Sequence, residues 1–162
     1  MVDVGAKPPT QRRALARARV VFPPGMLQRI LADGGPKGPI TEVARIAGIL
    51  AAKRTADLIP LCHPLALDHV DLTFEEQGDC VLEVRCRASC TGRTGVEMEA
   101  LTGAAVGALT IYDMVKGIDK AVRLESIELL EKSGGRSGDW RRPAGDDSCQ
   151  SEPGDSAAGG AG

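Results

Sequence analysis

The sequence has little of what several classes of protein depend on. Its 162 residues contain only two histidines, His63 and His69, in one short segment, which excludes a metal site built from several histidines. The formal net charge is −2, so the charge balance gives no reason to expect nucleic-acid binding. No apolar run reaches about 18 residues and no charged-then-apolar leader opens the chain, so we expect no membrane segment and a cytoplasmic protein.

The cysteines are also poorly placed for bridging or metal binding. The five, at positions 62, 80, 86, 90 and 149, are odd in number and form no Cys-x-x-Cys pair, so a disulfide framework is not expected. Cys80 and Cys86 fall in an alternating segment, where each fits as a small apolar residue. The spacing of Cys86 and Cys90 on a strand is poor for zinc, so we expect no metal site.

The length predicts a single domain over residues 1–140 followed by a disordered tail over residues 141–162. The tail, RRPAGDDSCQSEPGDSAAGGAG, has no periodic apolar face, and we expect it to be dispensable. The remaining length is enough for a two-layer core.

Hydrophobic periodicity gives the order of elements in this domain. Residues 13–22, 68–75, 80–89 and 122–132 are predicted strands, the middle two forming a hairpin around EEQGD. Residues 25–34 and 42–59 are predicted helices, the second with Thr41 as N-cap and a stripe of Val43, Ile46, Ala47 and Leu50. Residues 98–118 form a long Gly/Ala-rich helix that suits close packing, including at a subunit contact.

The resulting order is strand, helix, helix, strand, strand, helix, strand. With one helix set aside it is β-α-β-β-α-β, the ferredoxin-like unit. We therefore predict an α+β fold with a four-stranded antiparallel sheet and helices on one face.

The segment LIPLCHPLALDHV, residues 58–70, admits three interpretations: a metal half-site, a catalytic pair, or an apolar turn. Its prolines hold the backbone extended and can project Cys62 and His63 rigidly. The structural alternative is a buried turn whose histidine bonds a neighbouring carbonyl. As a functional group, His63 fits best as a donor to an anionic or carbonyl ligand.

Acidic and basic groups recur in the second half of the chain. Glu97 and Glu99 suit a helix start by their charge, but they can serve one site only if the segment is extended or just entering the helix. Asp113 and Lys116 share a helix face, where the alternative is a weak surface ion pair. Because 14 residues span about 21 Å of helix, Glu99 and Asp113 require a long ligand or a site shared between subunits.

Two glycine-rich loops carry cations. Lys37 in GGPKG is, taken alone, an ordinary solvated lysine. The loop KSGGR, residues 132–136, combines cationic groups with exposed backbone N–H groups, which suits phosphate although the Walker spacing is absent.

Four stretches carry a resemblance: MVDVGAK, ARIAGILAAKRTADLIPLCHPL, TGVEMEALTGAAVGALTIYDMVK and KSGGRSGDW. Over residues 1–140 the chain resembles the MoaC family, the cyclic pyranopterin monophosphate synthases of molybdenum cofactor (molybdopterin) biosynthesis. The resemblance implies a ferredoxin-like fold and a homohexamer, a trimer of dimers with the site at the dimer interface. It also implies a lyase that acts after a radical SAM GTP cyclase, converting 3′,8-cyclo-7,8-dihydro-GTP to cyclic pyranopterin monophosphate and pyrophosphate.

The same resemblance implies roles for particular residues. The catalytic set would be Asp113, Lys116, Lys37 and Lys132, with a lysine of lowered pKa near Asp113. The substrate-binding set would be Leu61, Cys62, His63, Glu97, Met98, Glu99 and Arg136, the last standing where lysine is common. No resident metal or cofactor is implied, although Mg²⁺ could accompany the triphosphate. Which lysines act in proton transfer and which bind phosphate stays open.

Two other hypotheses compete with this one. A non-catalytic nucleotide-binding module on the same fold would keep the phosphate-binding cations but would not need Asp113. A Cys/His metal or redox protein would need Cys62 together with Cys86 or Cys90 in one cluster.

Overall fold

The computed structural model describes residues 1–143. The elements along the chain are β1 (Thr10–Val21), α1 (Met26–Asp33), α2 (Ile40–Ala52), α3 (Thr55–Leu58), β2 (His69–Gln77), β3 (Val81–Gly92), α4 (Glu97–Val115), β4 (Arg123–Ser133) and β5 (Trp140–Arg141). The predicted tail lies outside the described residues from position 144 onward.

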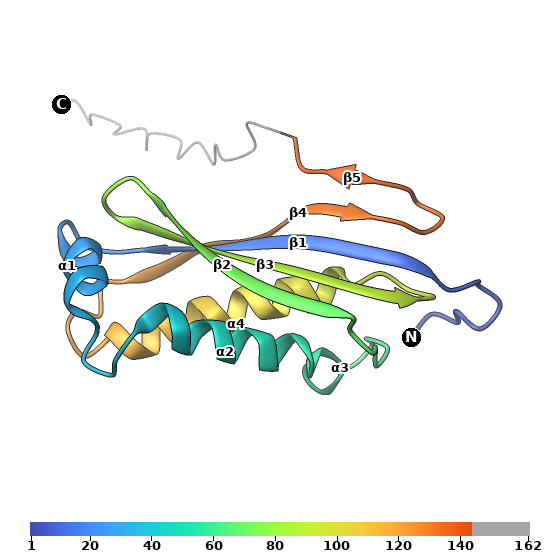
Figure 1. The fold of residues 1–162 in the computed structure, drawn as a ribbon, viewed down its shortest axis with the longest axis horizontal. Coiled ribbons are helices and arrows are strands. Elements are labelled where there is room, and N and C mark those ends of the chain that lie inside the picture. Colours follow the sequence, from blue (N-terminus) through green and yellow to red (C-terminus); the bar gives the residue numbers. More distant parts are fainter. Residues whose placement is uncertain (144–162) are drawn as a thin grey trace, which may run out of the picture.

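The strands form one antiparallel sheet in the order β2-β3-β1-β4-β5. Helices α2 and α4 cover one face of this sheet, and among the described residues no helix covers the other (Figure 1). The predicted α+β class is confirmed, but the sheet has five strands and not four. The fifth was missed because two residues carry no periodicity.

The edge strand β5 includes the first residue of the predicted tail. Arg141 pairs with Glu131 in the sheet, and the backbone N–H of Arg142 donates to the carbonyl of Leu130. The chain therefore remains hydrogen-bonded two residues beyond the boundary expected at position 140.

The helix predicted over residues 42–59 is wrong in two respects. It is divided into α2 and α3, and its N-cap is Pro39, with no side-chain cap hydrogen bond, in place of Thr41. The stripe expected to face the core is largely exposed: Val43, Ile46 and Leu50 keep 41%, 61% and 50% of their surface. The buried face consists mainly of small residues, because α2 packs closely against α4.

Glycine makes this close packing between the helices achievable. A Cβ added at Gly48 would lie 2.4 Å from Leu72 Cδ2 and 2.7 Å from the carbonyl oxygen of Gly103. Gly103 and Gly107 of α4 are likewise buried against α2 and the sheet. The close packing expected for the small residues of α4 is therefore seen at Gly103 and Gly107 within one chain.

Replacement of Gly48 tests this packing. Gly48→Ala should lower the free energy of unfolding by about 1–3 kcal/mol, because the methyl group meets backbone that cannot move aside. Urea denaturation measures the change. Gly117→Ala is the matched control, since nothing lies within 4 Å of a Cβ there, and it should be neutral or slightly stabilising. Equal stability of the two variants would contradict the expectation.

Candidate active site

The turn between β3 and α4 brings two carboxylates to one place. Helix α4 begins at Glu97, so Glu97 and Glu99 lie in its first turn, as the sequence required for a shared site. The Glu97 carboxylate folds back over Gly95, where an added Cβ would lie 1.8 Å from its Oε2 atom. A side chain at position 95 would therefore displace that carboxylate from its position.

Both glutamates line a cavity of about 460 Å³, here called the glutamate cavity. It gathers six of the predicted substrate-binding residues, Leu61, Cys62, His63, Glu97, Met98 and Glu99, together with Val2, Val4, Lys7, Leu65, Thr94 and Gly95. The loop between α3 and β2, the N-terminal segment and the start of α4 therefore meet at one end of the molecule (Figure 1).

Burial favours the protonated form of two side chains in this cavity, Glu99 and Cys62. Burial raises the pKa of Glu99, the charge of Glu97 raises it further, and a hydrogen bond to its own backbone N–H opposes them. Burial, and then the charge of Glu99, raises the pKa of Cys62, which disfavours a thiolate and hence a catalytic Cys-His pair. His63 is half-buried and makes no hydrogen bond within residues 1–143, so its ring is available to a ligand.

A second cavity of about 320 Å³, here called the cationic cavity, adjoins the first. The two share Lys7, Thr94, Gly95 and Glu97. Six cationic side chains line the cationic cavity: Lys7, Arg12, Arg13, Arg93, Lys132 and Arg136. The predicted residues Lys132 and Arg136 thus stand next to the glutamate cavity, in a site suited to several phosphate groups.

The loop after β4 shapes the cationic cavity. Gly134 and Gly135 have φ angles of 90° and 79°, and a Cβ at Gly134 would lie 2.0 Å from the carbonyl oxygen of Gln11. Arg12 crosses from β1 and donates to the carbonyls of Gly92 and Gly134, at 3.4 Å and 3.3 Å. It therefore ties the loop after β3 to the loop after β4, while Lys132 donates to Ser137.

The remaining predicted catalytic residues form a separate cluster. Asp113 accepts from Lys37 at 2.6 Å and lies 2.7 Å from Lys116, and all three side chains are about half exposed. Lys37 is presented by a tight turn in which Gly35 and Gly38 exchange backbone hydrogen bonds and Gly38 has a φ of 99°. We call these three residues the aspartate cluster.

The two lysines determine the charge state of Asp113. Hydrogen bonds from Lys116 and then Lys37 lower its pKa to about 2, so it is ionised at neutral pH. Its carboxylate in turn raises the pKa of Lys116. The expectation of a lysine with lowered pKa beside Asp113 is therefore wrong for Lys116, because the nearby negative charge favours the ammonium form.

Within one chain the aspartate cluster is remote from both cavities. It lies at the end of α4 that is close to α1, whereas the cavities lie at the end close to α3 (Figure 1). Fourteen residues of helix separate Glu99 from Asp113, which is about 21 Å. A single chain thus carries two parts of a candidate site that do not meet.

The side chains that could bind a metal or act in redox chemistry are dispersed within residues 1–143. This part of the chain holds no cluster of three or more His, Cys, Asp and Glu side chains arranged to bind a metal. Cys62, Cys80, Cys86 and Cys90 are free thiols, and burial raises the pKa of Cys86 to about 12.

No helix within residues 1–143 is both long and apolar enough to span a bilayer.

The raised pKa of Glu99 predicts a pH-dependent effect on stability. The folded state holds this proton more tightly than the unfolded chain, so ionised Glu99 lowers stability as pH rises through its two pKa values. Glu99→Gln should therefore raise the melting temperature by a few degrees at about pH 8 and give no gain at about pH 3, where the unfolded carboxyl is also protonated. Calorimetry at both pH values tests this, with the exposed Glu42→Gln as control. A gain at low pH would contradict the electrostatic cause.

Fold and cavities together define an α+β protein with a carboxylate-lined cavity beside a cationic cavity at one end of its sheet. The sequence model of the MoaC family matches residues 1–135, and the chain belongs to that family. It is 55% identical over 143 residues to the cyclic pyranopterin monophosphate synthase of Chloroflexus aggregans, covering 88% of this chain and 87% of the relative. The Thermomicrobium roseum synthase is 55% identical over 144 residues, covering 88% and 86%. Cyclic pyranopterin monophosphate synthase 1 of Mycobacterium tuberculosis is 52% identical over 151 residues, covering 93% and 89%.

Four cationic residues of the cationic cavity were not predicted as site residues: Lys7, Arg12, Arg13 and Arg93. Lys7 stands in the first of the resembling stretches, MVDVGAK, which was the available signal. Arg12 and Arg13 lie in the first half of β1, and Arg93 lies between Gly92 and Thr94, so nothing local distinguishes them from solvated surface arginines.

Proposed function

We propose that the chain is a cyclic pyranopterin monophosphate synthase, a lyase of molybdenum cofactor biosynthesis. Its substrate would be 3′,8-cyclo-7,8-dihydro-GTP and its products cyclic pyranopterin monophosphate and pyrophosphate. One observation carries the proposal: the glutamate cavity adjoins the cationic cavity, with four lining residues in common. A purine-derived ring and its triphosphate need those two environments side by side.

The glutamate cavity fits the ring system. A guanine-derived edge presents N–H donors, which carboxylates at Glu97 and Glu99 can accept. His63, facing the same cavity, can donate to a carbonyl or an anionic oxygen of the ligand. Leu61, Cys62 and Met98 supply the apolar and weakly polar walls.

The cationic cavity fits the triphosphate. Lys132 and Arg136, with Lys7, Arg12 and Arg93, would bind the phosphate oxygens and stabilise the charge that develops when pyrophosphate leaves. No resident metal or cofactor is part of this proposal, and Mg²⁺ would enter bound to the triphosphate.

The aspartate cluster would complete the site from a second chain. Met98, Ala105, Leu109, Asp113 and Lys116 share one face of α4, and each is exposed or half-buried. If two copies of α4 pair antiparallel about a two-fold axis near Ala105, Asp113 of one copy lies across from Met98 of the other. Helices pack about 8–10 Å apart, so Asp113, Lys116 and Lys37 would reach the partner's glutamate cavity.

A second exposed surface is available for assembly beyond the dimer. The exposed stripe of Val43, Ile46 and Leu50 on α2 is a large apolar surface for a monomer to leave in water. We propose that it contributes a further contact in a homohexamer, a trimer of dimers. Without β5, the strand order β2-β3-β1-β4 with both long helices on one face also supports the ferredoxin-like assignment.

This activity also gives the protein a place in a reaction sequence. Its cyclised nucleotide must come from an enzyme that joins the ribose to the purine, which the resemblance identifies as a radical SAM GTP cyclase. We place both reactions in the cytoplasm.

Incubation of the purified protein with the cyclised GTP intermediate tests the proposal. We expect pyrophosphate and a pterin product to form together in equal amounts. Binding of the nucleotide without either product would favour the non-catalytic nucleotide-binding module. Metal analysis of the purified protein tests the Cys/His hypothesis, which requires a stoichiometric metal.

A further inference from the structure

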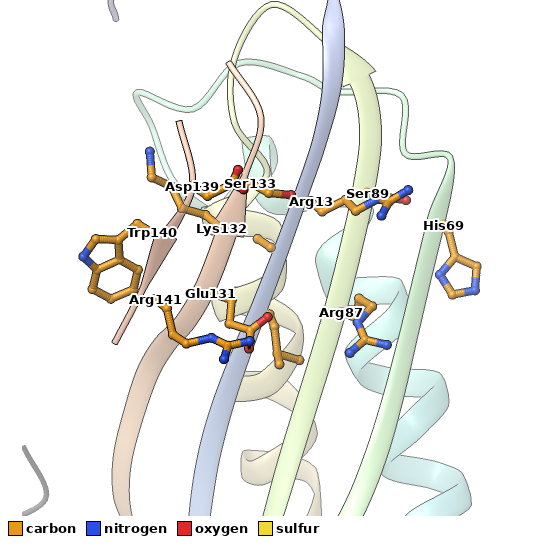
Figure 2. A pocket seen from close by; sticks show the side chains of 12 residues that line it. Arg13, His69, Arg87, Ser89, Glu131, Lys132, Ser133, Asp139, Trp140 and Arg141 are labelled. Atoms are coloured by element: carbon orange, nitrogen blue, oxygen red, sulfur yellow. Dashed lines mark ion pairs between the residues drawn. The ribbon is translucent and has the colours of Figure 1, made fainter. Parts of the chain in front are cut away.

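The helix-free face of the sheet carries a broad groove that the proposed reaction does not use. Its volume is about 760 Å³. Arg13 comes from β1, Arg87 and Ser89 from β3, His69 from β2, and Trp140 and Arg141 from β5 on the far side of β4 (Figure 2). The groove thus crosses the full width of the sheet.

Charge is distributed unevenly along this face. Away from the groove the arginines are matched by glutamates: Arg17 lies 2.8 Å from Glu128, Arg19 lies 3.1 Å from Glu125, and Arg85 lies 2.9 Å from Glu75. Glu83 is almost fully buried between Arg17 and Arg85, at 3.6 Å and 2.5 Å. This half of the face is an ion-pair network that neutralises itself.

The groove lacks such compensation. Within residues 1–143, the side chains of Arg87 and His69 make no ion pair or hydrogen bond, and the Arg13 guanidinium donates only to the neutral side chain of Gln11. The acids in the lining are Glu131, which pairs with Arg141 at 2.8 Å, and Asp139, which accepts from the backbone of Gly134. The Arg13 and Arg87 guanidinium groups therefore leave an unneutralised cationic patch beside the neutral network.

The groove also adjoins the proposed site. Arg13, Lys132 and Ser133 line both the groove and the cationic cavity. An anion held in the cationic cavity can therefore move past these residues into the groove while it stays in contact with cationic side chains. This continuity distinguishes the groove from an isolated basic patch.

We propose that the groove is a second phosphate-type anion site, which receives pyrophosphate after it leaves the cationic cavity. This rests on the proposed function for the origin of the pyrophosphate, but binding itself depends only on the groove. Pyrophosphate carries several negative oxygens on two phosphorus atoms, which suits the Arg13 and Arg87 guanidinium groups with Ser89 and Ser133 as further donors.

Titration calorimetry of the full chain with inorganic pyrophosphate tests the proposal without any turnover. We expect two equivalents to bind per chain, with affinity falling as salt is added because the groove is open to solvent. Arg87→Ala should weaken one of the two sites about tenfold or more, since a charge-assisted contact is lost from a site that has few others. Arg87 lines the groove but not the cationic cavity, so the cationic cavity stays intact.

Arg19→Ala is the matched control, because it removes an arginine from the same face that is already paired with Glu125. It should leave both binding events unchanged. Binding of a single equivalent by the wild type, or equal weakening by Arg19→Ala and Arg87→Ala, would overturn the proposal. If the protein binds two equivalents of pyrophosphate but fails to convert the cyclised nucleotide, the groove is still an anion site. Only the proposed function is then refuted.

Discussion

Mixed dimers of two inactive variants should regain activity when each variant damages a different end of α4. Combining His63→Ala with Asp113→Ala chains after dissociation should restore about a quarter of wild-type turnover, since half of randomly formed two-fold dimers are mixed and each holds one intact site. The expectation follows from the distance between the glutamate cavity and the aspartate cluster within one chain.

The structure also supplies the negative control for this experiment. Lys37 and Asp113 are hydrogen-bonded at 2.6 Å in the same chain. The sequence had left open that these two residues come from different chains, which is wrong for the aspartate cluster. Lys37→Ala mixed with Asp113→Ala should therefore give no recovery, because every mixed site still lacks one of the two.

Subunit exchange must be verified by mass spectrometry or a tag on one variant. Recovery of activity with both mixtures of variants would indicate either an artefact of the exchange or a site that residues of either chain can complete. Absence of recovery with His63→Ala and Asp113→Ala, despite verified mixing, would contradict a site shared across α4.

The strand and helix order could be read from the sequence because its periodicity is strong. Alternation from Ala14 to Val20 in β1, for example, matches side chains that are buried on one face only. The sequence also required the segment of Glu97 and Glu99 to be extended or just entering a helix if both serve one site, and both lie in the first turn of α4.

The features that the sequence did not predict were missed for identifiable physical reasons. Helix α2 is apolar on two faces, and hydrophobicity alone selected Val43, Ile46 and Leu50, whereas packing selected the small residues that fit against α4. The partnership of Lys37 with Asp113 joins residues 76 positions apart, which no local pattern reveals. The arginines of the cationic cavity depend on where the loops after β3 and β4 meet, and this is a property of the tertiary structure.

Asp113→Asn should reduce kcat by on the order of 10²-fold or more while leaving substrate affinity nearly unchanged. The change keeps the shape of the side chain but removes the negative charge that holds Lys37 and Lys116 at 2.6 Å and 2.7 Å. It also removes a proton acceptor that stays ionised down to low pH, because those lysines lower its pKa to about 2. Stability should change little, since the side chain is 52% exposed.

Two variants separate this effect from a generic loss of charge. Glu42→Gln removes a carboxylate from another exposed i,i+3 pair, with Arg45 at 3.8 Å, and should leave steady-state kinetics unchanged. Lys132→Ala should raise KM as well as lower kcat, because a contact to the triphosphate already exists in the ground state. If Asp113→Asn turned over at the wild-type rate, the aspartate cluster would be a surface ion-pair network with no part in the chemistry. Catalysis would then have to be sought within the glutamate and cationic cavities.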